Sequence, residues 1–77
     1  MILLIKVKLY GVIRLSAGVS QFETNVATLE ELKGILPGIS RKEANDLIVL
    51  VNGNPVKKNY RFEDADEVVF LAPAGGG

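Results

Sequence analysis

The sequence predicts an α+β domain in which one main helix packs across a mixed sheet of four to five strands. Three observations predict this class. Apolar residues alternate with lysines over Leu3–Leu9, which is the period of a strand with one buried face. Leucines recur at helical spacing after Thr28. Dense apolar runs then return at Leu47–Val51 and Val68–Ala72.

The N-terminal half predicts a hairpin. In the first strand, Lys6 and Lys8 lie on the face opposite to the apolar residues. A turn around Gly18 leads into a weaker strand over Val19–Val26. Two adjacent strands with a short link favour antiparallel pairing.

A helix is predicted to begin after Thr28. Thr28 and Glu31 have the spacing of a capping box, in which each side chain satisfies an amide of the other residue. Pro37 and Gly38 stop the helix. One apolar stripe is formed by Leu29, Leu32, Ile35 and Leu36. The same capping pattern at Ser40–Glu43 predicts a second, single-turn helix that ends before Asp46.

The C-terminal half supplies the remaining strands. Leu47–Val51 has no alternation, which predicts a strand covered on both faces. Asn52–Pro55 predicts a tight turn, and Val56–Tyr60 a short edge strand that two lysines protect from edge pairing. A polar turn over Phe62–Glu67 precedes the last strand, Val68–Ala72. With the first, third and last strands inside the sheet, this order predicts a β-grasp, the ubiquitin-like architecture.

The composition of the chain argues against several classes of function. The 77 residues predict one domain, with residues 1–71 as the folded part and 72–77 as a flexible glycine tail. Nine basic and nine acidic side chains give no net charge, which argues against a nucleic-acid partner. The chain has no His and no Cys, which argues against an autonomous enzyme. The apolar runs are too short to cross a bilayer and no leader is visible, so we expect a soluble cytoplasmic protein without a membrane partner.

Most polar clusters have a structural interpretation. The acidic residues of the turn, Glu63, Asp64, Asp66 and Glu67, lack the spacing of a calcium loop, so a solvated turn is favoured and no metal site is expected. Lys57 and Lys58, near Tyr60 and Arg61, have the chemistry to touch a phosphate and a base, but protection of a sheet edge is the favoured role.

Two aromatic residues are candidates for partner docking. Tyr10 is expected on the face of the first strand opposite to the helix. If Phe70 shares that face, the pair forms an exposed aromatic patch. The alternative, with equal support, is that Phe70 packs in the core.

The C-terminal sequence is the main candidate site. After Pro73, the residues Ala74, Gly75, Gly76 and Gly77 carry no side chain larger than a methyl group. Such a segment can thread a channel that excludes larger residues, and it leaves the terminal carboxylate accessible. Taken alone, three glycines are more typical of a disordered end or an expression remnant than of a working tail.

The residues around this tail resemble the MoaD/ThiS family of ubiquitin-like sulfur carriers. The segments that carry the resemblance are "VNG" at Val51–Gly53, "FEDADEVVFLAPAGGG" at Phe62–Gly77 and the opening "IKVKLYGVIRLSAG". The tail aligns with the family ending, so Gly76 and Gly77 match its terminal glycine pair. Ala65 and Leu15 depart from the pattern, which usually has a glycine in the acidic turn and an acidic residue after the arginine.

The resemblance implies a mechanism in which partners do the chemistry. A ubiquitin-activating-like enzyme uses ATP to adenylate the carboxylate of Gly77, and a sulfur donor such as a cysteine desulfurase leaves a thiocarboxylate there. The tail, Pro73 to Gly76, then delivers the sulfur to an acceptor synthase subunit. The carrier itself binds no cofactor.

Four hypotheses remain open at this point. The last strand and the residues before the tail are closer to the MoaD branch, the small subunit of molybdopterin synthase, whereas the short chain favours ThiS and thiamin thiazole synthesis. A ubiquitin-like modifier, conjugated through the same diglycine, is a third hypothesis. A binding module with an irrelevant tail is the fourth.

Overall fold

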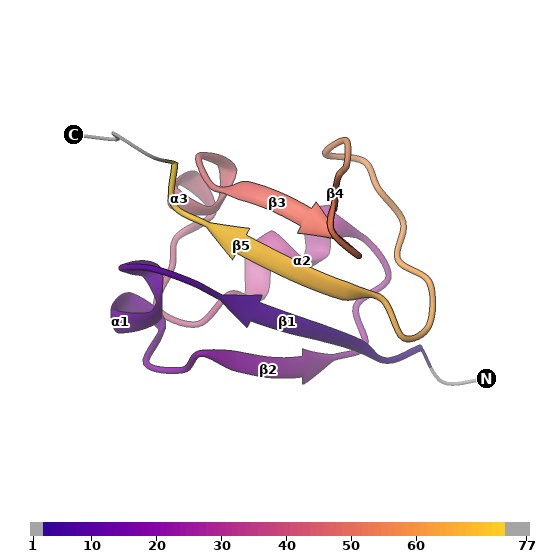
Figure 1. Cartoon of the computed structure of the whole chain (residues 1–77), viewed down its shortest axis with the longest axis horizontal. Coiled ribbons are helices and arrows are strands. Elements are labelled where there is room, and N and C mark those ends of the chain that lie inside the picture. The colour runs from indigo at the N-terminus through magenta and orange to yellow at the C-terminus, as the bar shows by residue number, and fades with distance from the viewer. Residues whose placement is uncertain (1–2, 74–77) are drawn as a thin grey trace.

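The computed structural model of the chain describes residues 3–73. Its elements in chain order are β1 (Ile5–Leu9), α1 (Ile13–Ala17), β2 (Gln21–Thr24), α2 (Leu29–Ile35), α3 (Arg41–Asn45), β3 (Ile48–Val51), β4 (Asn54–Pro55) and β5 (Glu67–Leu71) (Figure 1). The strands form one five-stranded sheet in the order β2-β1-β5-β3-β4. β5 pairs in parallel with β1 and antiparallel with β3. The predicted α+β class and the inner position of the first, third and last strands are confirmed.

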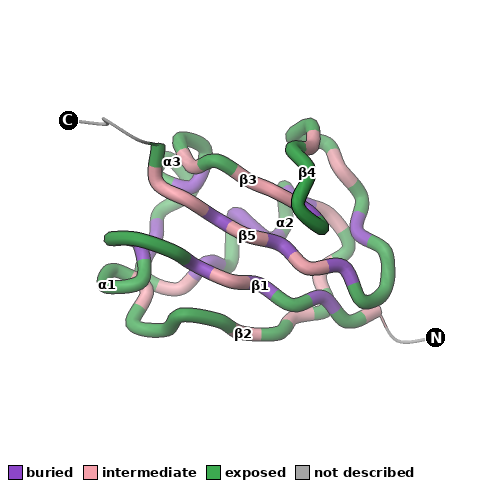
Figure 2. Tube along the Cα trace, in the orientation of Figure 1, coloured by how far each residue is buried: buried purple, intermediate pink, exposed green. Residues whose placement is uncertain are grey.

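One face of the sheet carries the core. Figure 2 shows buried and partly exposed residues alternating along β5, as expected for a strand with one covered face. α2 crosses behind the sheet (Figure 1) and supplies leucines to the same core. The buried apolar residues are Ile5, Val7, Leu9, Ile13, Leu29, Leu32, Leu36, Ile39, Ala44, Val51, Phe62, Val68 and Phe70.

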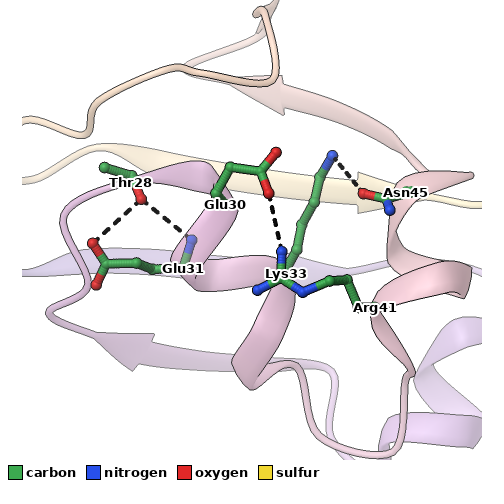
Figure 3. A network of polar contacts seen from close by, with 6 residues as sticks. All are labelled: Thr28, Glu30, Glu31, Lys33, Arg41 and Asn45. Atoms are coloured by element: carbon green, nitrogen blue, oxygen red, sulfur yellow. Dashed lines mark hydrogen bonds and ion pairs between the residues drawn. The ribbon is translucent and has the colours of Figure 1, made fainter.

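The predicted capping residues are present at the N-termini of α2 and α3, and Figure 3 shows those of α2. Thr28 Oγ1 accepts from the Glu31 amide at 3.2 Å, and its hydroxyl donates to the Glu31 carboxylate at 3.3 Å, so Glu31 returns to the side chain of Thr28 rather than to its amide. Ser40 and Glu43 form the complete capping box. One part of the predicted stripe is wrong, because Ile35 is exposed while the three leucines are buried.

Polar contacts join α2 to α3. Lys33, although buried, donates from Nζ to Asn45 Oδ1 at 3.4 Å, which satisfies part of its hydrogen-bonding demand (Figure 3). Arg41 pairs with Glu30 at 3.0 Å on the surface of the two helices. The surface pair adds little stability, so the leucines account for most of the packing of α2.

The link between β1 and β2 contains a helix that the sequence did not predict. α1 is only five residues long and has no side-chain cap at its N-terminus. Ile13 anchors it to the core, and Gly18 ends it in the left-handed conformation, with its amide donating to Arg14 O at 2.9 Å. The formation of this helix therefore depends on the burial of one isoleucine in the core.

Two strand predictions in the C-terminal half need correction. The predicted edge strand over Val56–Tyr60 is wrong, because β4 comprises only Asn54–Pro55 and pairs with the end of β3. The prediction that β3 is covered on both faces is also wrong, since Ile48 is exposed and Val51 alone is buried. The tight turn is confirmed, with positive φ at Asn52 and Gly53, which is the geometry of a two-residue hairpin.

Gly38 places α1 against the α2–α3 connection and yields a stability prediction. Its φ is +66°, and a Cβ at this position would collide with the backbone oxygen of Ser16 in α1. Gly38→Ala is expected to lower the free energy of unfolding by about 2–4 kcal/mol, from left-handed strain plus the clash. Urea denaturation measures this loss.

Gly53→Ala is the matched control for Gly38→Ala. Gly53 also has a positive φ, +85°, but a Cβ there meets no atom within 4 Å. Its expected cost is the conformational strain alone, about 1–2 kcal/mol. Equal losses for the two variants would mean that the contact between Gly38 and α1 does not constrain the fold.

Candidate functional site

The C-terminal segment leaves the domain at the end of the sheet's middle strand. β5 lies between β1 and β3, and its last residues pair as Leu9↔Phe70 and Ile48↔Leu71. The Tyr10 amide donates to Phe70 O at 3.1 Å, so the end of β1 is held beside the end of β5. Ala72 packs partly against the core, whereas Pro73 is exposed. We call Ala72 and Pro73 the tail root.

The structure describes one of the five predicted tail residues. Pro73 lies at the edge of the domain, where the last described residue is accessible to a partner. Ala74, Gly75, Gly76 and Gly77 lie outside the described residues. Their roles, including adenylation of Gly77, stay predictions.

Of the two alternatives for Phe70, the structure supports packing in the core and contradicts the aromatic patch. Phe70 has 0% exposure, and its parallel register with Leu9 puts both side chains on the helix-covered face. Tyr10 is 46% exposed and follows Leu9, so the two aromatic residues do not share a surface. Phe70 is thus a core residue, and docking through Tyr10 stays a prediction.

A different set of apolar residues is exposed beside the tail root. Because side chains alternate, the register places Leu50 beside Val69, and Ile48 beside Leu71, on the face away from α2. None of these four is buried, and Ile48 is among the exposed large hydrophobic residues. We call Ile48, Leu50, Val69 and Leu71 the outer apolar strip. The sequence showed the apolar run of β3, but only the pairing shows which of its residues face outward.

Charged residues border this strip on the β1 side. The predicted outward orientation of Lys6 and Lys8 agrees with their pairing with Glu67 and Val69. Lys8 Nζ lies 3.5 Å from the Glu67 carboxylate, and both side chains are partly exposed. Because both side chains are partly exposed, both groups are accessible to a partner, and the ion pair itself adds little stability.

The turn before β5 contains a buried carboxylate, whereas the sequence predicts a solvated turn. Asp66 is only 4% exposed. Its Oδ1 accepts from Asn52 Nδ2 at 2.9 Å, and its Oδ2 accepts from the Tyr60 hydroxyl at 3.0 Å and from the Glu63 amide at 2.8 Å. The solvated-turn interpretation is therefore wrong for Asp66. The network fixes the start of β5 against the β3–β4 turn.

These hydrogen bonds set the charge state of Asp66. Burial favours its neutral form, but the donors from Glu63, Asn52 and Tyr60 outweigh burial and lower the pKa of Asp66. Burial, and then the hydrogen bond to Asp66, raises the pKa of Tyr60. Asp66 is consequently ionised, and Tyr60 protonated, at neutral pH.

The lowered pKa predicts acid-sensitive stability. Since the folded-state pKa is below the unfolded value of about 3.9, the contribution of Asp66 is complete above that value. It is lost as the pH falls through the lower, folded pKa. Asp66→Asn is expected to cost about 1–3 kcal/mol at neutral pH, because an amide cannot accept all three bonds. The free energy of unfolding of Asp66→Asn should also fall less steeply as the pH is lowered, as measured by urea denaturation across pH.

Asp46→Asn is the control for the Asp66 variant. Asp46 is exposed, and no side-chain hydrogen bond involves it within residues 3–73. Its stability curve should follow that of the unchanged protein. Parallel acid profiles for the unchanged protein and Asp66→Asn would contradict the assigned role of Asp66.

The other polar candidates do not converge on a site. Lys57, Lys58 and Arg61 are exposed, whereas Tyr60 turns inward and contacts Phe62 edge to face at 5.6 Å between centroids. Because β4 ends at Pro55, the lysines do not lie on an edge strand, and the edge-protection prediction is wrong. Within residues 3–73, no group of three His, Cys, Asp or Glu side chains is placed to hold a metal ion. No helix in this range is long and apolar enough to span a membrane.

Solved structures share this fold. The solution structure of small archaeal modifier protein 1 from Methanosarcina acetivorans has a TM-score of 0.78 and 21% identity, and the match covers 100% of this chain and 99% of that chain. A chain from the complex of subunits 1 and 2 of molybdopterin-converting factor from Helicobacter pylori 26695 has a TM-score of 0.71 and 20% identity, and the match covers 97% of this chain and 100% of that chain. The solution structure of Urm1 from Trypanosoma brucei has a TM-score of 0.68 and 22% identity, and the match covers 96% of this chain and 95% of that chain. No curated protein matches the chain in sequence.

The mixed sheet with a central C-terminal strand and α2 across one face defines a β-grasp, ubiquitin-like protein. A family model described as "ThiS family" matches residues 7–77. The chain belongs to the ThiS family, a family of small ubiquitin-like sulfur carriers.

Proposed function

We propose that the working group of this carrier is the carboxylate of Gly77. In this cycle a partner activating enzyme uses ATP to join AMP to the carboxylate, with release of pyrophosphate. The persulfide of a sulfur donor, such as a cysteine desulfurase, then displaces AMP to form an acyl disulfide, and a thiol reduces this disulfide to leave a thiocarboxylate. The acyl-adenylate makes an unreactive carboxylate susceptible to attack, so the carrier needs no nucleophile of its own.

The placement of β5 is the observation that supports this proposal best. The strand is paired on both sides, and its side chains Val68 and Phe70 are fully buried. It therefore anchors the sequence that follows, and Pro73 lies exposed at the edge of the domain. Beyond Pro73 the chain has only alanine and glycine, which suits insertion into a narrow active site.

The outer apolar strip is the proposed surface on which partners hold the carrier. It borders the tail root, and four partly exposed aliphatic residues give an apolar centre with charged residues beside it. Protein interfaces commonly have such an apolar centre and a polar rim. Tyr10, beside the same end of β5, extends the proposed surface.

We propose molybdopterin synthesis as the pathway that receives the sulfur, with an acceptor synthase subunit as the second partner. The fold likeness to a chain of the Helicobacter pylori molybdopterin-converting factor complex supports this choice. Thiamin thiazole synthesis is the alternative. The likeness to a small archaeal modifier protein supports conjugation to proteins as another candidate.

Intact-protein mass spectrometry tests the proposal. The chain is incubated with ATP, a sulfur donor and an extract of its native organism, and the expected product has one oxygen replaced by sulfur. Fragmentation should place this replacement at Gly77. A large mass gain mapped to a lysine linkage would support the modifier instead. No gain in an extract that activates other carriers would overturn the proposed cycle.

A further inference from the structure

Three exposed apolar residues lie in or next to α1. Leu15, within the helix, is 83% exposed, Val12, just before it, 68%, and Val19, just after it, 41%. Single exposed apolar residues are common on protein surfaces, but these three belong to one short segment. These three residues do not pack in the core, because Ile13 is the residue that anchors the helix.

Arg14 lies between two shallow hollows of this surface. One hollow, of about 250 Å³, is lined by Lys8, Leu9, Tyr10, Arg14, Ser20 and Gln21. The other, of about 430 Å³, is lined by Arg14, Leu15, Gly18, Val19 and Ser20. Arg14 is exposed and borders both. We call Val12, Arg14, Leu15 and Val19 the α1 patch.

The charge of this region is positive. Neither hollow has an acidic lining residue, while Lys8 and Arg14 both line the first. Arg14 makes no ion pair with any residue from 3 to 73, and Lys8 has one partially exposed partner, Glu67. A cation bordered by apolar side chains is suited to a partner's carboxylate with an apolar rim, and arginine and tyrosine are enriched in interfaces of this kind.

The α1 patch is continuous with the proposed working end of the molecule. Tyr10 lines the first hollow, and its amide is bonded to Phe70 O at the end of β5. Figure 1 shows α1 at the same end of the sheet as the last described residues of the chain. A partner that receives the tail from the tail root can therefore contact α1 at the same time.

We propose that the α1 patch is a specificity contact for the activating enzyme, in which an acidic side chain of that enzyme binds Arg14 beside Lys8. This inference rests on the proposed function. The activating enzyme is chosen because it must recognise the carrier before the carboxylate of Gly77 is modified, when only the folded surface and the bare tail distinguish this chain from others. Apolar residues of the enzyme cover Leu15 and Val19.

Carrier-dependent exchange of pyrophosphate into ATP, catalysed by the activating enzyme purified from the native organism, tests this contact. Arg14→Glu is expected to raise the KM for the carrier about tenfold or more, with kcat nearly unchanged, because the substitution weakens docking and leaves the tail intact. Arg14→Gln should raise KM less and make it less sensitive to salt. Lys58→Glu, the same charge change at an exposed loop residue, should leave KM unchanged.

The outcomes separate the two proposals. If the unchanged carrier supports no exchange, the proposed function fails, and the contact fails with it. If it supports exchange and the KM of Arg14→Glu is unchanged, the α1 contact is overturned while the function stands. Equal effects of Arg14→Glu and Lys58→Glu would also overturn it, because net charge alone would then explain the loss. Urea denaturation checks each fold, and Arg14→Gln decides the test if Arg14→Glu does not fold.

Discussion

Gly77→Phe is expected to abolish the exchange of oxygen for sulfur while leaving the fold unchanged. A phenyl group at the proposed reacting carboxylate cannot enter a channel shaped for glycine, and misplacement of a reacting group by about 1 Å costs about a hundredfold in rate. The folded core lies within residues 3–73, so the free energy of unfolding should not change. Intact mass after reaction and urea denaturation measure the two quantities.

Lys58→Phe is the matched control for Gly77→Phe. It adds the same aromatic ring at an exposed loop residue and leaves the tail as it is. This variant should gain sulfur like the unchanged protein. Full sulfur incorporation by Gly77→Phe would show that the terminal glycine is not the working residue.

Phe70→Ala is expected to lower the free energy of unfolding by about 3–5 kcal/mol. Phe70 is fully buried in the middle strand, between its neighbours in β1 and β3, so truncation leaves a cavity at the centre of the core. In a domain of fewer than about 80 residues the core rarely supplies more than about 3–5 kcal/mol of stability, so the variant should be close to unfolding at 37 °C. Urea denaturation with a fluorescence or circular dichroism signal gives the loss.

Tyr10→Ala separates core packing from surface chemistry. Tyr10 is half-exposed at the end of β1, and its removal should cost much less stability than the loss of Phe70. If Tyr10 belongs to a docking surface, the variant should instead raise the KM for the carrier in the exchange reaction. A larger stability loss for Tyr10→Ala than for Phe70→Ala would refute the assignment of Phe70 to the core.

The elements that could be predicted from the sequence are those with local signals. Period-two alternation predicts β1, a capping pattern with recurring leucines predicts α2, and a second capping pattern predicts α3. The residues that begin and orient these elements lie within a few positions of one another. The Asn52–Gly53 turn was predictable for the same reason. α1 has no such signal, since one buried isoleucine and the glycine that follows define it.

The remaining errors concern contacts between distant segments. Phe70 faces inward because it pairs with Leu9 in a parallel register, and nothing near Phe70 in the sequence encodes that register. Asp66 was placed in solvent because its donors include Asn52, which lies fourteen positions earlier in the chain. The outer apolar strip required the same long-range information. The tail itself was predicted from composition and resemblance, and its chemistry remains for experiment.

The position of β5 also has a consequence for biosynthesis. β5 is the middle strand of the sheet, and within residues 3–73 it follows the other four strands, whereas its partner β1 precedes them. A nascent chain cannot complete the sheet until β5 has left the ribosome, because β5 joins β1 to β3. A chain truncated before β5 would lack both the central strand and the terminal glycines. A truncated product would therefore neither fold nor carry sulfur, because the residues that complete the fold directly precede those proposed to react.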